Sequence, residues 1–282
     1  MRIIKNEPLS NHTSYMTGGD AKLFLEPYTT QDLIEAIQYI KNEKFFILGK
    51  GSNVLFSDNF FDGVVLSLKN LNRYVFIDGN MLVSGAGCLL DDIVKFSILN
   101  DLGGIEELSG IPGSVGGAVF MNAGAFDGEI KDVVNYVKIV DMSGKTILLK
   151  KNEINFKYRS SGLDKKIVVE AGFFLSKGAN LYKREEILSK RESKQPLDYP
   201  SCGSVFKRPK GNFAGTLIES CGLKGYRIGN AKVSEKHANF IVNLGGATST
   251  DIYNIIQYVK DKVYKETGIM LEEEVKLVNF DV

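Results

Sequence analysis

The sequence contains no tryptophan and, within 282 residues, only two histidines, three cysteines and six prolines. With His12 and His237 alone, a multi-histidine metal site is not expected, and we expect no bound metal. Cys88, Cys202 and Cys221 are odd in number and widely spaced. That spacing excludes a disulfide framework and fits a reducing cytoplasm.

The sequence also lacks an excess of either charge and any long apolar run. The formal net charge is +1, whereas a nucleic-acid-binding protein would show a strong basic excess. No apolar run approaches the length that crosses a membrane, and residues 1–20 lack the apolar core of a signal peptide. We therefore expect a cytoplasmic protein with small-molecule partners, without nucleic acid or membrane, as a monomer or weak oligomer.

Glycine is concentrated in an unusual place, because residues 109–125 read SGIPGSVGGAVFMNAGA. A core strand would not hold so many glycines, since each costs backbone entropy and packs nothing. A flexible linker would not carry the apolar residues Ile111, Val115 and Phe120. We therefore expect buried backbone here that lies against a large polar ligand, with its N–H groups turned toward that ligand.

A second glycine turn lies in FFILGKGSNVL, residues 45–55, where Ser52 and Asn53 suit a phosphate group. An ordinary hairpin turn is the alternative for either segment alone, but together they favour a dinucleotide or flavin clamp. Neither segment is the usual dinucleotide fingerprint, because the third glycine and the following helix are missing, and no Walker-type loop is present.

The hydrophobic spacing predicts a mixed fold. Helices are expected at 30–42, 89–102, 183–193, 216–221 and 250–267, and strands at 45–48, 54–56, 75–77, 81–83, 133–140, 146–150, 166–175, 239–244 and 271–280. Strands and helices do not alternate strictly, so we expect an α+β fold rather than a doubly wound parallel sheet. The charged helix at 183–193 is expected to present a solvated face.

Three segments place polar residues where chemistry is possible. CGSVFKR puts Ser204 after a glycine and before Lys207 and Arg208; a domain-entry turn is the alternative. FKYRSS sets Arg159 among aromatics, either as a fixed cation or as an exposed arginine over Tyr158. In LEEEVKL, period two places Glu274 beside an apolar surface, although an exposed acidic strand end is more common.

Taken together, these motifs resemble the UDP-N-acetylenolpyruvoylglucosamine reductase family of bacterial peptidoglycan precursor synthesis. The likeness spans nearly the whole chain and includes 47–57, 85–87, 108–125, 158–161, 203–209, 217–243 and 271–275. The shorter form of the family is the one resembled, because no extra loop bearing a substrate-covering tyrosine is present. The resemblance implies an α+β fold whose two-part FAD-binding region is of the vanillyl-alcohol-oxidase type, followed by a substrate domain.

The resemblance also implies domains at 1–70, 71–195 and 196–282, with the last strand returning toward the active site. Non-covalent FAD is implied on two sets of residues. The pyrophosphate set is Gly49, Lys50, Gly51, Ser52, Asn53, Gly110, Ile111, Pro112, Gly113, Ser114, Gly116, Gly117 and Ala118. The set near the isoalloxazine is Asn122, Ala123, Gly124 and Ala125.

The implied reaction is NADPH-dependent reduction of an enol ether through FAD. Ser204 would donate a proton to C2, Arg159 would stabilise the developing charge, and Glu274, when protonated, would hydrogen-bond the same carboxylate. Candidates for contacting the uridine diphosphate substrate are Tyr158, Lys207, Arg208 and Tyr199; Arg208 stands where some members have asparagine. The alternatives are an FAD-dependent alcohol oxidase of the same superfamily and a non-enzymatic sugar-nucleotide-binding module.

Overall fold

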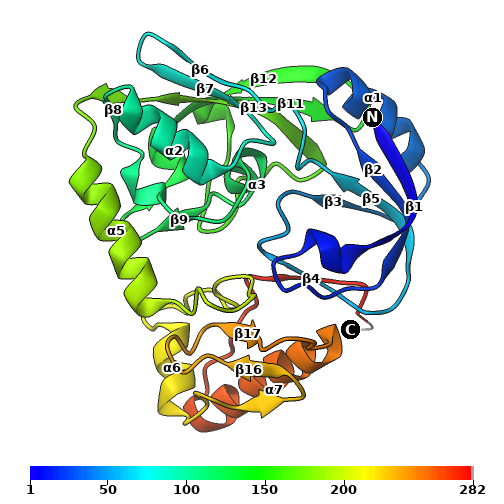
Figure 1. The fold of residues 1–282 in the computed structure, drawn as a ribbon, viewed down its shortest axis with the longest axis vertical. Helices are drawn as coiled ribbons and strands as arrows, with labels where there is room; N and C mark the ends of the chain where they lie inside the picture. Colours follow the sequence, from blue (N-terminus) through cyan, green and yellow to red (C-terminus); the bar gives the residue numbers. More distant parts are fainter. Residues whose placement is uncertain (281–282) are drawn as a thin grey trace. The chain divides into compact units, whose positions relative to one another are not determined.

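The structure is a computed structural model that describes residues 1–280, and its chain divides into two compact units. The first unit comprises Met1–Lys5, Leu23–Lys50 and Asp62–Lys190. The second comprises Asn6–Lys22, Gly51–Phe61 and Arg191–Val282. Figure 1 follows the chain by colour through both units. The three-domain division expected above stays a prediction. No helix of residues 1–280 is long and apolar enough to cross a membrane.

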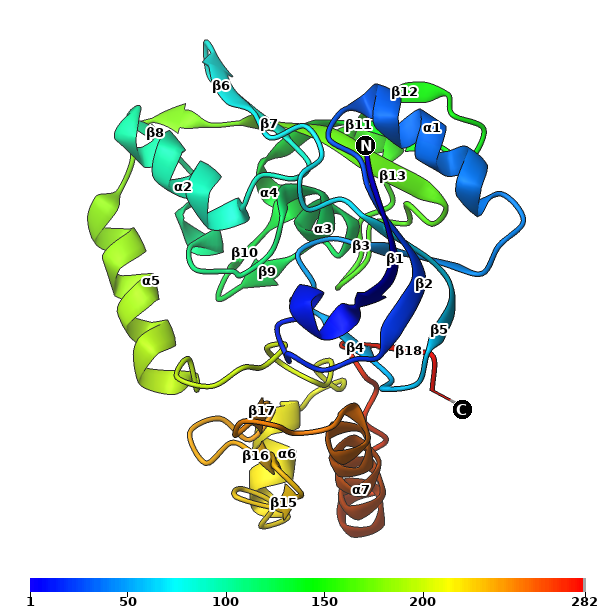
Figure 2. The same ribbon diagram turned by 45° about the vertical axis from the view of Figure 1, so that its right-hand side comes forward.

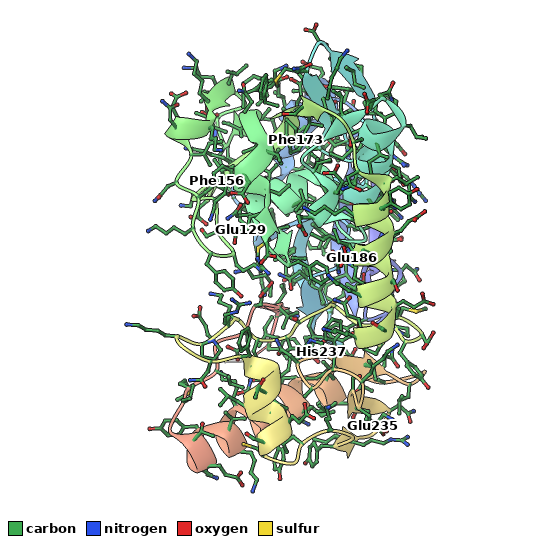
Figure 3. All side chains as sticks on the ribbon, turned by 90° about the vertical axis from the view of Figure 1, so that its left-hand side faces the viewer. Glu129, Phe156, Phe173, Glu186, Glu235 and His237 are labelled. Carbon is green, nitrogen blue, oxygen red and sulfur yellow. The ribbon has the colours of Figure 1, made fainter. Side chains whose placement is uncertain are left out.

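A five-stranded antiparallel sheet forms the centre of the first unit. Its order is β12-β11-β13-β7-β6, with β6 Val75–Asp78, β7 Met81–Gly85, β11 Val134–Asp141, β12 Thr146–Lys150 and β13 Lys166–Phe174. Both predicted hairpins are confirmed, because β6 pairs with β7 and β11 with β12. Figures 1 and 2 show two helices on one side of this sheet, α2 Leu90–Leu99 and α3 Val115–Phe120. Phe173, labelled in Figure 3, is fully buried on β13.

A second sheet has the order β1-β2-β5-β3, with β1 Arg2–Pro8, β2 Asp20–Glu26, β3 Phe45–Leu48 and β5 Phe61–Ser67. The strand predicted at 45–48 is therefore confirmed, and it pairs in parallel with β5. Helix α1, Thr30–Ile40, precedes it and begins with a capping box between Thr29 and Asp32. The buried face of α1 carries Leu33 and Ile37, which confirms the predicted amphipathic helix.

The second unit contains a small sheet with two helices. Strands β15 Arg227–Ile228, β16 Ala231–Val233 and β17 Ile241–Asn243 form the sheet, and the helices are α6 Ala214–Ser220 and α7 Ser249–Thr267. The predicted apolar stripe of α7 is confirmed, since its buried residues include Ile252, Ile256 and Val263. Gly268 ends the helix with a left-handed φ of 71°. A further parallel pair joins β4 Val54–Phe56 to β18 Lys276–Val278.

The remaining elements are short. Strands β8 Leu102–Gly103 and β14 Ser176–Lys177 pair with one another, as do β9 Gly124–Ala125 and β10 Gly128–Glu129. Helix α4, Ile130–Val133, follows β10. The prediction of a helix over 89–102 is too long at its end, because Asn100 and Asp101 leave the helix and β8 begins.

One prediction of local structure is wrong. The segment 271–280 is a strand only over β18, and before it Glu273 forms a single bridge with Phe206. The alternation argument for Glu274 therefore does not apply. Helix α5, Leu181–Lys194, presents the solvated face that was expected, but two of its charged residues, Arg184 and Arg191, lie on the opposite stripe and are only 6% and 7% exposed. The charged side chain of Arg184 can be buried because it has a carboxylate partner, as described below.

Candidate active site

The structure brings the two glycine turns together. A Cβ atom placed on Gly49 would lie 3.1 Å from Oγ of Ser114 and 3.8 Å from Cα of Gly117. Ser114 is the N-cap of α3 and accepts a hydrogen bond from the Gly117 amide at 3.4 Å. The turn after β3 and the start of α3 thus form one surface built of small residues, and a side chain at Gly49 would fill it.

The expectation that the N–H groups of residues 109–118 face a ligand is wrong for most of them. The amides of Val115 and Gly116 donate to the carbonyls of Cys88 and Ala86, and that of Ala118 donates to Ser114 O. Helix formation and pairing with residues 86–90 use these donors. Because its glycines have no side chains, the segment would let a ligand come close to the backbone. It does not present a row of free amide donors to that ligand.

A buried ion pair holds the first bend of this segment. Gly110 has a φ of +71°, and its amide donates to Oδ1 of Asp91 at 2.8 Å. Arg184 of α5 makes hydrogen bonds of 2.7 and 3.0 Å to the two oxygens of the same carboxylate. Partial burial alone would raise the pKa of Asp91, but hydrogen bonds from Arg184, Gly110 and Lys95 outweigh it and hold that pKa well below its usual value.

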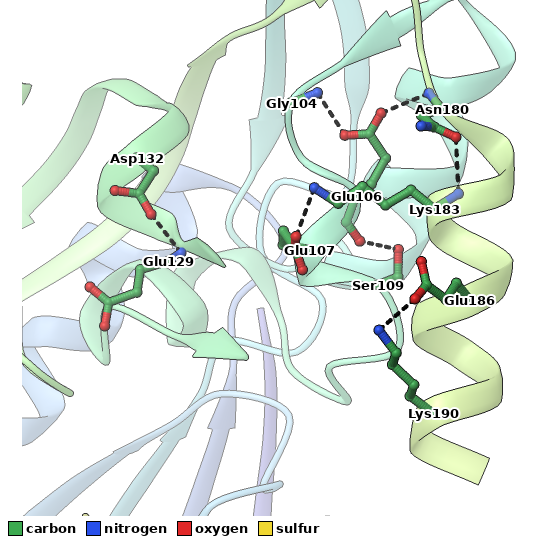
Figure 4. A network of polar contacts seen from close by, with 10 residues as sticks. All are labelled: Gly104, Glu106, Glu107, Ser109, Glu129, Asp132, Asn180, Lys183, Glu186 and Lys190. Atoms are coloured by element: carbon green, nitrogen blue, oxygen red, sulfur yellow. Dashed lines mark hydrogen bonds and ion pairs between the residues drawn. The ribbon is translucent and has the colours of Figure 1, made fainter. Parts of the chain in front are cut away.

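Two further carboxylates attach the first turns of α5 beside this bend (Figure 4). Glu106 is buried and accepts hydrogen bonds from the amides of Gly104 and Asn180 at 2.7 and 2.8 Å. Lys183 pairs with Glu107 at 2.7 Å. No pattern in the sequence predicts these contacts, because they join residues that lie far apart along the chain.

Gly51 begins a stretch of the second unit, where the turn residues have structural roles. Gly51 has a φ of +77°, and a Cβ there would lie 1.9 Å from the carbonyl oxygen of His12, so no other residue fits. Asn53 donates from Nδ2 to the carbonyl of Glu274 at 3.1 Å, and its own carbonyl accepts from the amide of Lys276 at 3.0 Å. The Asn53 side chain therefore holds the segment that carries Glu274.

Ser204 and Glu274 lie on neighbouring segments of the second unit. The amide of Glu274 donates to the carbonyl of Val205, the residue after Ser204, at 2.7 Å. Asn239 fixes the same segment, since it donates to the carbonyl of Phe206 at 2.9 Å and accepts from its amide at 3.0 Å. The two predicted catalytic residues are thus brought together, and Asn239 is a contributor that sequence reasoning missed.

Arg159 lies in the first unit, in a two-residue turn closed by paired hydrogen bonds between Lys157 and Ser160. Its φ is +54°, a conformation that favours glycine. Its Nη2 donates to the carbonyl of Gly124 at 2.9 Å, and its guanidinium lies over the ring of Tyr158, 4.8 Å from the centroid. The guanidinium is half-buried, stacks on Tyr158 and is fixed by a backbone acceptor, so the structure combines elements of both alternatives, and its role toward an anionic ligand stays a prediction.

Asn122 is the member of the isoalloxazine set with the most contacts. It is fully buried, has a φ of +43°, and uses both amide protons and its carbonyl oxygen in hydrogen bonds within the protein. Gly124 and Ala125 form β9, and the amide of Ala123 donates to the carbonyl of Ala118 at 2.8 Å. Asn122 is therefore tied to the protein rather than turned outward.

The predicted substrate residues have varied surroundings. Lys207 pairs with Glu272, and Arg208 lies over the ring of Phe213 at 4.5 Å from the centroid. Tyr199 is 46% exposed and lines a hollow of about 350 Å³ with Met16, Asn243 and Gly245 among others. Tyr158 is also exposed at 46%. These four residues are accessible to a ligand from solvent.

Comparison with known proteins identifies the family. Residues 21–150 match the FAD binding domain model, and residues 195–278 match the model of the UDP-N-acetylenolpyruvoylglucosamine reductase C-terminal domain. The reductase of Caldanaerobacter subterraneus is 45% identical over 98% of this chain and 94% of its own length. That of Listeria monocytogenes is 44% identical over 98% and 95%.

A solved structure agrees with these matches. The UDP-N-acetylenolpyruvylglucosamine reductase of Thermus caldophilus superposes with a TM-score of 0.84 at 32% identity, covering 98% of each chain. The fold and the paired glycine turns thus define an FAD-containing oxidoreductase, which confirms the expected cofactor and the expected α+β fold class. The chain belongs to the UDP-N-acetylenolpyruvoylglucosamine reductase family, in its shorter form.

Proposed function

We propose that this protein reduces the enolpyruvyl group of UDP-N-acetylglucosamine enolpyruvate, with NADPH as the reductant, to give UDP-N-acetylmuramate. The observation that carries the proposal is the meeting of Gly49 with Ser114 and Gly117, the cradle that a Cβ would fill. The names of the relatives supply the substrate. The proposed setting is the cytoplasm, with a monomer or weak oligomer as the working form.

The residues at the two glycine turns fit non-covalent FAD. Gly49, Lys50, Gly51, Ser52 and Asn53 of the first turn, together with residues 110–118, would bind its pyrophosphate. The backbone of the segment 122–125 would flank the isoalloxazine, since the polar atoms of the Asn122 side chain all bond within the protein. FAD, when bound, would take hydride from NADPH and pass it from N5 to C3 of the enolpyruvyl group.

Arg159 and Glu274 would stabilise the charge that hydride addition places on C2 and spreads into the substrate carboxylate. Arg159 offers a fixed guanidinium, and Glu274, when protonated, would donate a hydrogen bond to the same carboxylate. Donors of this kind typically contribute about 3 kcal/mol each to the stability of the transition state. Ser204 would give its hydroxyl proton to C2, where contact with a strongly basic carbon outweighs the weak acidity of a hydroxyl.

The substrate diphosphate would be held by Lys207 and Arg208, with Tyr158 and Tyr199 as further contacts. Lys207 would exchange its ion pair with Glu272 for a phosphate oxygen. Because the side chain of Glu272 is 71% exposed, this exchange leaves its carboxylate in water, where it needs no partner.

The test separates the two half-reactions. In Ser204→Ala, reduction of the flavin by NADPH is expected to stay nearly unchanged, while reduction of the sugar nucleotide falls on the order of 10²- to 10⁴-fold. Ser201→Ala, in the same segment, serves as the control and should alter neither half-reaction. If Ser204→Ala slows both half-reactions equally, the proton-donor role is wrong.

Steady-state kinetics give an independent test. If NADPH and the sugar nucleotide use the same face of one flavin, they compete with each other and the mechanism is ping-pong. Double-reciprocal plots of initial velocity against sugar-nucleotide concentration, taken at several NADPH concentrations, should then be parallel lines. Intersecting lines would contradict the single-face arrangement. NADH in place of NADPH measures the nucleotide preference in the same assay.

A further inference from the structure

The turn that carries Arg159 is fastened to one short segment, Phe120 to Gly124, at three alternate residues. The carbonyl of Phe120 accepts from the Ser161 hydroxyl at 2.8 Å and from its amide at 3.1 Å. The carbonyl of Gly124 accepts from Arg159 itself at 2.9 Å. Between them, Nδ2 of Asn122 donates to the carbonyl of Lys157 at 3.0 Å.

Asn122 donates to the same carbonyl oxygen that closes the turn. The carbonyl oxygen of Lys157 also accepts from the amide of Ser160 at 3.1 Å, which is the bond that closes the turn. Arg159 occupies the second central position of this turn with a φ of +54°, where only glycine is unstrained. A non-glycine residue stays in that conformation only when its surroundings determine it fully, and Asn122 supplies one such constraint.

Asn122 can supply that constraint because it is itself immobile. Its second amide proton is donated to Oε2 of Glu129 at 3.0 Å, and its carbonyl oxygen accepts from the amide of Lys131 at 3.0 Å. Glu129, labelled in Figure 3, also pairs with the side chain of Lys131 at 2.5 Å. Since Asn122 is fully buried, the loss of any of these bonds leaves a polar atom without water as a replacement.

We propose that Asn122 is a positioning residue that sets the location of the Arg159 guanidinium through the carbonyl of Lys157. The proposal rests on the role given above to Arg159 and deepens it. The side chain of Asn122, whose polar atoms all bond within the protein, would not contact the reacting atoms. Its consequence for the reaction is confined to the step that Arg159 assists, the transfer to the sugar nucleotide.

The test variant is Asn122→Gly, which keeps the left-handed backbone and removes the side chain. The matched control is Asn72→Gly in the same unit. Asn72 has a φ of 49° and likewise donates two hydrogen bonds from Nδ2, to Oγ1 of Thr30 at 2.9 Å and to the carbonyl of Val169 at 3.1 Å. Both variants lose two hydrogen bonds donated by a side-chain amide, which is fully buried at Asn122 and half-buried at Asn72, so a merely structural effect would appear in both.

The enzyme with bound FAD is reduced with NADPH under anaerobic conditions and then mixed with the sugar nucleotide, and the return of flavin absorbance is followed. Asn122→Gly is expected to slow this step on the order of 10- to 100-fold, because a displaced cation misses the developing charge. Its flavin content and its rate of reduction by NADPH should match those of Asn72→Gly. A return of absorbance as fast as in Asn72→Gly would overturn the proposal.

A double variant separates this proposal from the role of Arg159. If Asn122 acts through Arg159, then Arg159→Met and Arg159→Met/Asn122→Gly should be equally slow in the transfer step. If the effects of Arg159→Met and Asn122→Gly on the transfer rate are fully additive, the positioning role of Asn122 is wrong while the role of Arg159 stands. If Arg159→Met leaves the transfer step at the wild-type rate, the role of Arg159 fails, and the positioning role fails with it.

Discussion

The ion pair between Arg184 and Asp91 should contribute strongly to the stability of the first unit. The Arg184 side chain is 7% exposed and makes two hydrogen bonds to the carboxylate. In Arg184→Met the apolar stem still packs, but the Asp91 charge loses its main partner. Removing one partner of a fully buried pair costs about 3 to 5 kcal/mol. Asp91 is 25% exposed and keeps Lys95, so we expect a loss of about 2 to 3 kcal/mol.

The matched control is Lys183→Met on the adjacent position of α5. Lys183 pairs with Glu107 at 2.7 Å but is 41% exposed, so its loss should cost less than about 1 kcal/mol. The double variant Asp91→Asn/Arg184→Met should recover part of the stability lost in Arg184→Met, because the unpaired charge is gone.

The free energy of unfolding is measured by urea denaturation followed by circular dichroism, since the chain has no tryptophan to report by fluorescence. The reasoning is refuted if Arg184→Met is no less stable than Lys183→Met. It is also refuted if the double variant is less stable than Arg184→Met, since the cost would then arise from lost packing and not from an uncompensated carboxylate.

Three other outcomes are expected. Because the folded pKa of Asp91 lies below its unfolded value of about 3.9, its contribution is present above that pH and lost on acidification; the stability difference between Asp91→Asn and wild type, measured by urea denaturation at several pH values, should shrink below about pH 4. Thr248→Ala removes the N-cap of α7 and should lower the unfolding free energy by about 1 kcal/mol, with an equal or higher stability counting against the cap. Burial raises the pKa of Cys202 to about 12, so in a native thiol titration this cysteine should react only after unfolding, unlike Cys88 and Cys221, and a fast third thiol would contradict this.

Local patterns made the regular elements of the fold predictable. The stripe of α7 and the hairpins β6–β7 and β11–β12 follow from periodicity and turn chemistry over a few residues. The segment 109–125 was predictable as a special region but not as a helix, because glycines at 116 and 117 disfavour helices. The contacts that override that preference come from residues 86–90, and no local pattern contains them.

The residue types of the candidate site could be predicted from the sequence, but the residues that hold them in position could not. Ser204, Arg159 and Glu274 were predicted from motifs of the family. The side chains that hold these residues in place could not be predicted. Asp91, Asn122 and Asn239 act through side-chain hydrogen bonds to backbone atoms distant in sequence. Such bonds depend on the placement of whole segments, so a single sequence carries no periodic or spacing signal for them.

The backbone at Arg159 has a consequence for selection on this protein. Glycine at that position would relieve the conformational cost of the left-handed backbone, and it would lose the hydrogen bond to Gly124 and the stacking on Tyr158. It would also remove the guanidinium on which the proposed chemistry depends. A screen for thermal tolerance alone therefore exerts no selection for the guanidinium itself, and any programme of stabilisation should hold this turn fixed.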